Sequence, residues 1–166
     1  MIKYIDCDGV ILDTETGLFD EYNELKKVNP GLKKRQYLHD MDWENWIWQA
    51  GVLNDAVYLL KNFDPRYVEI LTRVHSLAEA RAKINYFREN GVRNNVIVVP
   101  DGIMKSSVVD PFQNVLVEDS KSNLEDWDVH HGIPIYYGTG ESIYPTVTSL
   151  DAVLDDEKFK CLVKRI

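Results

Sequence analysis

Five short runs rich in Val, Ile and aromatic residues are separated by segments with helical periodicity. These runs contain few polar residues, which is typical of strands covered on both faces in a parallel sheet. They comprise residues 2–8, 68–72, 95–100, 114–119 and 133–137. The alternation of strands and helices predicts an α/β, Rossmann-like fold, with a doubly wound, mainly parallel five-stranded sheet.

The clearest helix lies between the second and third predicted strands. Ser76 and Glu79 match a capping box, in which each side chain accepts a hydrogen bond from the other residue's backbone N–H. Apolar residues then repeat at helical spacing: Leu77, Ala80, Ile84 and Phe87. Asn90-Gly91 follows, and a glycine in the left-handed conformation is typical of the end of a helix. Strand, helix and strand in this order form a βαβ unit with a right-handed crossover. A last helix is predicted from Ser149.

One connection is much longer than usual. The chain between Asp13 and Asp64 shows no strand pattern, whereas most connections in compact domains have only a few residues. Three helices are predicted within it from the apolar residues Tyr22, Leu25 and Val28, then Trp43, Trp46 and Ile47, then Val57 and Leu60. We therefore expect residues 1–14 and 65–166 to form an α/β core domain, and residues 15–64 to be an inserted helical cap.

Composition narrows the class of protein. The 166 residues suit one domain with a small insert, and 45% hydrophobic residues are enough for a core. A formal net charge of −8 argues against a nucleic-acid polymer as partner. Apolar stretches are too short for a membrane span or a signal peptide. Cys7 and Cys161 offer no disulfide framework. We predict that the protein is cytoplasmic and has no membrane partner. The sequence leaves open whether it forms a homodimer.

Polar side chains gather where the predicted strands end. They are Asp6 and Asp8 after the first strand, Thr72 after the second, Lys105 before the fourth, and Glu118, Asp119 and Asn123 at or after the fourth. The carboxyl ends of parallel strands meet at one edge of a sheet, where ligands bind. Carboxylates buried together require a cation, and hard oxygen ligands favour Mg²⁺. The pattern therefore predicts a magnesium site.

These residues also resemble a known family. The segment Asp6–Thr14 (DCDGVILDT) resembles motif I of the haloacid dehalogenase-like phosphohydrolases, and Ile70–Thr72 resembles their motif II. Lys105 matches motif III and Val117–Asn123 (VEDSKSN) matches motif IV. The resemblance covers nearly the whole chain in order and spacing, and the insert lies where the family has its C1 cap. The small helical cap and the length are most similar to the 5′(3′)-deoxyribonucleotidase branch.

The resemblance implies a catalytic pair and a metal site. Asp6 is expected to attack phosphorus and form an aspartyl-phosphate. Asp8 is expected to protonate the leaving oxygen and then to activate water. Mg²⁺ is expected to bind the Asp6 carboxylate, the Asp8 backbone carbonyl and the Asp119 carboxylate. Glu118 and Asn123 are expected beside the ion, supporting its ligands.

The resemblance also implies a phosphate site and a reaction. Thr72, Arg73 and Lys105 are expected to bind phosphate oxygens. Lys83 is the alternative to Lys105, but it lies inside the capped helix. The expected activity is hydrolysis of a small-molecule phosphate ester, namely a (deoxy)nucleoside monophosphate. The alternatives are another small ester, such as a sugar phosphate or phosphoglycolate, or a non-enzymatic phosphorylation switch with Asp101 as acceptor.

Several further residues have two interpretations. His75 is either a substrate contact or a surface residue. The cap residues Trp43, Trp46 and Trp48 are more typical of a core than of a base-stacking platform, and Phe19 is another candidate for the cleft. Cys7 is expected to point to the opposite face of the first strand and to pack in the core.

Overall fold

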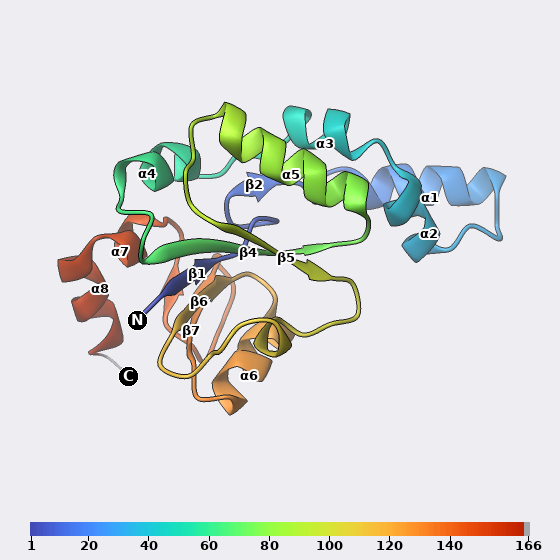
Figure 1. Cartoon of the computed structure of the whole chain (residues 1–166). Coiled ribbons are helices and arrows are strands. Elements are labelled where there is room, and N and C mark those ends of the chain that lie inside the picture. The colour runs from blue at the N-terminus through green and yellow to red at the C-terminus, as the bar shows by residue number, and fades with distance from the viewer. Residues whose placement is uncertain (165–166) are drawn as a thin grey trace.

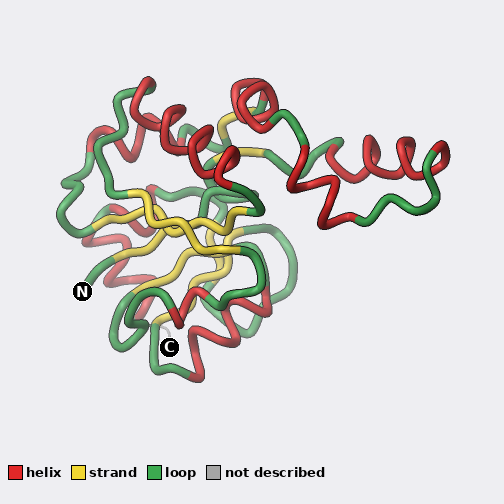
Figure 2. Tube along the Cα trace, turned by 45° about the vertical axis from the view of Figure 1, so that its right-hand side comes forward, coloured by secondary structure: helices red, strands yellow, loops and turns green. Residues whose placement is uncertain are grey.

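The computed structural model describes residues 1–164 and contains a parallel sheet between two layers of helices (Figures 1 and 2). The strands are β1 (Lys3–Ile5), β4 (Val68–Val74), β5 (Val96–Pro100), β6 (Val115–Glu118), β7 (Ile133–Tyr137) and β8 (Thr146–Val147). Their order in the six-stranded sheet is β5-β4-β1-β6-β7-β8, and every neighbouring pair is parallel. The predicted α/β fold and its five strands are confirmed. The two-residue edge strand β8 was not predicted, because two residues carry no periodic pattern.

The two faces of β1 pack against different helices, as the alternation of its side chains requires. Ile5 and Cys7 lie in the larger core cluster together with Phe87 of α5 (Leu77–Glu89). Tyr4 faces the other way and meets Trp127 of α6 (Lys121–Val129) edge to face, with ring centroids 5.6 Å apart. In Figure 1, α5 lies above the sheet and α6 below it. The predicted buried position of Cys7 is confirmed.

Helix α5 begins and ends as predicted, but its buried face is different. The Ser76 Oγ accepts a hydrogen bond from the Glu79 N–H at 3.1 Å, and Gly91 has a φ of +77°. The Glu79 carboxylate does not return to Ser76, because it accepts the His75 N–H instead at 2.6 Å. Leu77 is 90% exposed, whereas Glu79 and Lys83 are buried. The helix therefore presents a charged pair to the interior.

The inserted segment contains four helices instead of three. They are α1 (Leu18–Val28), α2 (Lys34–Asp40), α3 (Trp43–Gln49) and α4 (Ala56–Asn62). Helix α2 was missed because it is short and begins with polar residues. The two-residue strands β2 (Leu12–Asp13) and β3 (Gly51–Val52) pair antiparallel at the entrance of the insert. Figure 1 shows α3 beside α5, while α1 and α2 extend past the sheet. The boundaries of a separate cap remain a prediction.

The C-terminal segment forms two helices where one was predicted. They are α7 (Asp151–Leu154) and α8 (Asp156–Val163). Asp155 interrupts the helix, and its carboxylate accepts the N–H groups of Glu157 and Lys158 at 3.0 and 2.9 Å as the cap of α8. The predicted core extends to residue 166, and residues 165–166 lie outside the described part of the chain. Within residues 1–164, every helix is too short or too polar to cross a membrane.

Candidate active site

The polar residues predicted to meet at the sheet edge do meet there. Strand β1 is central, with β4 on one side and β6 on the other, so the loops that follow these strands converge. They surround a cavity of about 500 Å³ between the sheet edge and the inserted helices. Its lining includes Asp6, Asp8, Arg73, Glu118, Asp119 and Asn123. Thr72 and Lys105 are buried immediately behind this lining.

Lys105 lies between two buried carboxylates. It begins the short 3-10 helix η1 (Lys105–Ser107), which follows β5. Its Nζ is 2.7 Å from Asp6 Oδ1 and 2.6 Å from Glu118 Oε2. Glu118 Oε2 also accepts a hydrogen bond from Asn123 Nδ2 at 3.0 Å. Lys105 therefore contacts the carboxylate expected to be the nucleophile. Glu118 and Asn123 are hydrogen-bonded to each other.

Three carboxylates share this part of the cavity. One oxygen each from Asp6, Glu118 and Asp119 lies within 4.8 Å of the others. Burial and the charge of Glu118 raise the pKa of Asp6 well above its usual value. Burial, together with its contact with Glu118, raises the pKa of Asp119 to about 8. Lys105 offsets only part of this negative charge. An all-oxygen donor set with excess negative charge fits a hard divalent cation such as Mg²⁺.

Gly9 brings the loop after β1 against Asp119. Its φ of +72° lies in the left-handed region, and a Cβ at this position would be 2.0 Å from Asp119 Oδ2. Glycine therefore satisfies both the turn and the close approach. The backbone next to Asp8 is thereby held beside the Asp119 carboxylate, which is the arrangement the predicted metal site requires.

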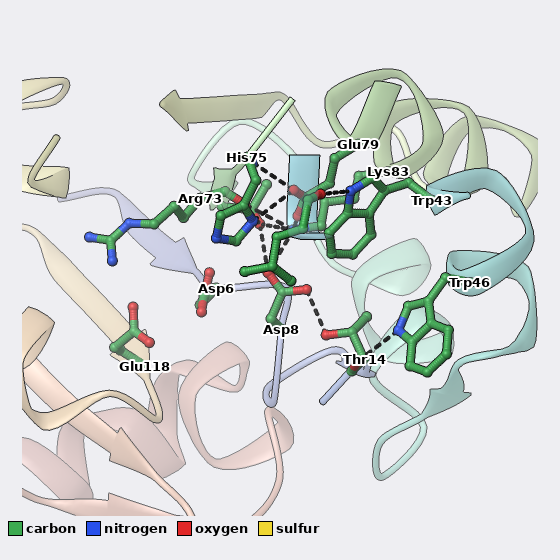
Figure 3. Close-up of polar contacts among 12 residues, drawn as sticks. Asp6, Asp8, Thr14, Trp43, Trp46, Arg73, His75, Glu79, Lys83 and Glu118 are labelled. Atoms are coloured by element: carbon green, nitrogen blue, oxygen red, sulfur yellow. Dashed lines mark hydrogen bonds and ion pairs between the residues drawn. The ribbon is translucent and has the colours of Figure 1, made fainter. Parts of the chain in front are cut away.

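Both carboxylate oxygens of Asp8 are held by donors from other elements (Figure 3). Thr14 donates to Oδ1 at 2.7 Å, and Lys83 donates to Oδ2 at 2.6 Å. Burial alone would raise the pKa of the Asp8 carboxyl, but Lys83 and Thr14 lower it overall. The sequence indicated Lys83 only as the alternative to Lys105, and its contact with Asp8 was not predicted. The available signal was Glu79, which lies one helical turn earlier and forms an ion pair with Lys83.

The residues after β4 extend the polar wall of the cavity. Arg73 donates from Nη2 to Asn123 Oδ1 at 3.3 Å, which links the second and fourth predicted motifs. His75 Nδ1 is 3.0 Å from Glu79 Oε2, and its ring lies parallel to that of Trp43 with centroids 6.1 Å apart. His75 therefore lines the cavity instead of lying on the open surface.

The cap aromatic residues divide between core and cleft. Trp43 is buried and contributes one edge to the cavity, whereas Trp46 donates to the Thr14 carbonyl at 2.8 Å. Trp48 is outside the cavity, half-exposed, and meets the Tyr86 ring edge to face. Phe19 lines the cleft, with Lys34 Nζ 4.0 Å from its ring centre.

Comparison with known proteins identifies the fold. No family model and no curated protein matches the sequence. Among solved structures, a haloacid dehalogenase-like hydrolase from Xanthomonas campestris is 12% identical, with a TM-score of 0.62 over 97% of this chain and 94% of that one. A β-phosphoglucomutase from Clostridium difficile is 15% identical, with a TM-score of 0.61 over 99% and 100%. A D,D-heptose 1,7-bisphosphate phosphatase from Burkholderia thailandensis is 13% identical, with a TM-score of 0.55 over 92% and 95%.

The parallel sheet and the acidic cluster at its edge define a Rossmann-like α/β protein with its polar site beyond the central strand. More narrowly, the chain has the haloacid dehalogenase-like fold. The fold part of the predicted resemblance is confirmed. The narrower deoxyribonucleotidase assignment remains a prediction.

Proposed function

We propose that the protein is a Mg²⁺-dependent phosphomonoester hydrolase that works through an aspartyl-phosphate on Asp6. One observation carries this proposal: the Asp6 carboxylate faces the cavity beside Lys105 and within the cluster that includes Asp119. A carboxylate in this position has a cation on one side and open space for a phosphate ester on the other. Asp101, the acceptor in the alternative switch, instead pairs with exposed Arg35 at 3.3 Å.

The proposed reaction has two halves. In the first, an Asp6 oxygen forms a bond to phosphorus, the ester P–O bond breaks, and Asp8 gives a proton to the leaving oxygen. In the second, a water oxygen bonds to phosphorus and gives a proton to Asp8. The bond between phosphorus and Asp6 then breaks, and inorganic phosphate leaves. Arg73 binds the phosphate oxygens in this proposal, because its guanidinium lines the cavity and donates to such oxygens. Thr72 and Lys105 were also expected to bind phosphate, but both are buried behind the cavity lining, where Lys105 pairs with Asp6.

Mg²⁺ would be held by the Asp6 and Asp119 carboxylates and by the Asp8 backbone carbonyl. When bound, the ion reduces the repulsion between the Asp6 carboxylate and an anionic phosphate. Glu118 and Asn123 support the site from behind, since both oxygens of Glu118 already accept hydrogen bonds from protein groups.

We propose that the substrate is a nucleoside monophosphate. We also propose that the protein is cytoplasmic. The cavity of about 500 Å³ is large enough for a nucleotide, and Phe19 and Trp43 add aromatic surface to it. A sugar phosphate is the second candidate. Its support is that two similar structures are a β-phosphoglucomutase and a D,D-heptose 1,7-bisphosphate phosphatase.

A screen of monophosphates with and without Mg²⁺ tests this function. We expect release of inorganic phosphate only with Mg²⁺, and faster release from nucleoside monophosphates than from sugar phosphates or phosphoglycolate. Removal of the ion by a chelator should stop the reaction, and added Mg²⁺ should restore it. The absence of Mg²⁺-dependent release from every ester would contradict the proposal. Faster release from sugar phosphates would contradict the proposed substrate but agree with the proposed reaction.

Mg²⁺ binding should also be visible without turnover. At a concentration of about 100 times its Kd, a ligand that binds only the folded state adds about 2.7 kcal/mol to the free energy of unfolding. For a chain of this length we therefore expect Mg²⁺ to raise Tm by about 5–10 °C. Asp119→Asn should lose this increase, because it removes one of the ion's carboxylates. Asp20→Asn, on the exposed side of α1, should keep it. Equal shifts in both variants would place the ion elsewhere.

A further inference from the structure

Lys83 is a fully buried cation for which the proposed reaction has no role. Its side chain extends from α5 into the space behind the cavity and is 0% exposed. Its Nζ lies near four oxygen atoms: Asp8 Oδ2 at 2.6 Å, Glu79 Oε1 at 2.7 Å, the Arg73 carbonyl at 2.9 Å and Thr72 Oγ1 at 3.0 Å. An ammonium group has three N–H donors, so the protein already occupies all of them.

Lys83 is therefore not placed to bind a substrate. It does not line the cavity, whereas Asp8 does, with 24% of its side chain exposed. A phosphate could reach the Lys83 ammonium only by displacing one of the protein oxygens. Any effect of Lys83 on the reaction must act through the groups it holds. Among these groups, the Asp8 carboxylate is the one proposed to give and receive a proton.

The contacts fix the Asp8 carboxylate at both ends. Lys83 holds Oδ2 from α5, and Thr14 holds Oδ1 from the chain that enters the insert. A side chain restrained at both oxygens cannot rotate about its terminal bonds without losing a hydrogen bond. The exposed edge of the carboxylate is thereby directed at the cavity.

Glu79 keeps Lys83 itself in place. Its Oε1 pairs with Lys83, and its Oε2 accepts the His75 N–H at 2.6 Å. Two carboxylates flank one buried ammonium, which offsets the cost of burying it. These contacts form one continuous network from the cavity wall to the start of α5 (Figure 3). It connects, in order, Asp8, Lys83, Glu79 and His75.

We propose that Lys83 is a positioning residue that holds Asp8 for the second half of the reaction, an inference that rests on the function proposed above. In that half, a water oxygen bonds to phosphorus, the bond from phosphorus to Asp6 breaks, and the water proton passes to Asp8. Lys83 contacts none of the reacting atoms. It sets the direction from which Asp8 receives the proton.

The test uses Lys83→Met with 4-nitrophenyl phosphate and Mg²⁺ in a rapid-mixing experiment. 4-Nitrophenolate leaves without a proton, so formation of the aspartyl-phosphate does not need Asp8, whereas its hydrolysis does. We expect a burst of about one equivalent of 4-nitrophenol per site, followed by turnover on the order of 10²-fold slower than in the wild type. KM should fall together with kcat, because the intermediate accumulates.

Two further variants calibrate this result, and a third replaces Lys83→Met if needed. Asp8→Asn should show the same burst and slow turnover, since it removes the group that Lys83 positions. Lys3→Met is the matched control, because Lys3 is also a buried lysine in an ion pair, with Asp156 at 3.0 Å, but at the opposite end of β1. It should retain wild-type kinetics. Lys83→Gln, which keeps an N–H donor without the charge, replaces Lys83→Met if that variant does not fold.

Each remaining outcome overturns the inference. Unchanged turnover in Lys83→Met would show that Asp8 does not depend on Lys83. Loss of burst and turnover to the same extent, in a folded variant, would assign Lys83 to phosphate binding. If the wild type releases neither 4-nitrophenol nor phosphate, the proposed function fails, and the positioning role fails with it. That result differs from the other two because it appears before any substitution is made.

Discussion

Asp6→Asn should reduce phosphate release by about 10⁴-fold or more while leaving the fold intact. An amide of the same shape cannot form the acyl phosphate, and losing a catalytic nucleophile typically costs this much. Stability should be preserved, because burial and Glu118 raise the pKa of Asp6 and so disfavour its charge in the folded state. A neutral side chain relieves that repulsion, and Lys105 keeps its ion pair with Glu118.

Steady-state release of phosphate, measured together with thermal unfolding, checks this prediction. The matched control is Asp101→Asn, which changes the other candidate acceptor at the rim of the same cavity. We expect Asp101→Asn to retain activity within a few-fold. Full activity in Asp6→Asn would show that another group attacks phosphorus, and a large loss in Asp101→Asn alone would favour the switch.

Gly9→Ala should affect activity and Mg²⁺ binding together. The added Cβ would be 2.0 Å from Asp119 Oδ2, so either the loop after β1 or the Asp119 side chain must move. A displacement of about 1 Å among positioned groups can cost about 10²-fold in rate. The positive φ of Gly9 adds a strain of about 1–3 kcal/mol for any other residue. We therefore expect at least a 10²-fold loss of turnover and a much smaller Mg²⁺-induced rise in Tm.

Gly102→Ala separates backbone strain from the collision. Gly102 has a φ of +85°, but a Cβ there would meet nothing within 4 Å. This variant should lose only the stability that the strain costs, and it should keep its activity and its Mg²⁺ response. If both variants behave alike, the approach of Gly9 to Asp119 has no special role in the site.

The sheet and the positions of the site residues could be predicted because they depend on local patterns. Buried parallel strands appear as apolar runs, and the chain must deliver the residues at their ends to one edge. Asp6, Glu118 and Asp119 accordingly lie together, with Lys105 between Asp6 and Glu118.

The missed features depend on contacts between distant segments. Lys83 is buried because Asp8, far away in the sequence, and Glu79 supply the opposite charges, and hydrophobic periodicity cannot represent such a network. Glu79 and Lys83 are on the buried face of α5, whereas Leu77 is exposed. Helix α2 and strand β8 are too short for a periodic signal.

Mass spectrometry can identify which residue becomes phosphorylated during the reaction. The protein is mixed with 4-nitrophenyl phosphate and Mg²⁺, quenched in acid within the first turnover, digested, and its peptides are examined by mass spectrometry. We predict a phosphoryl group on Asp6, present in the wild type and in Asp101→Asn and missing from Asp6→Asn. A phosphoryl group on Asp101, or turnover without any phosphorylated aspartate, would contradict the proposed attack of Asp6 on phosphorus.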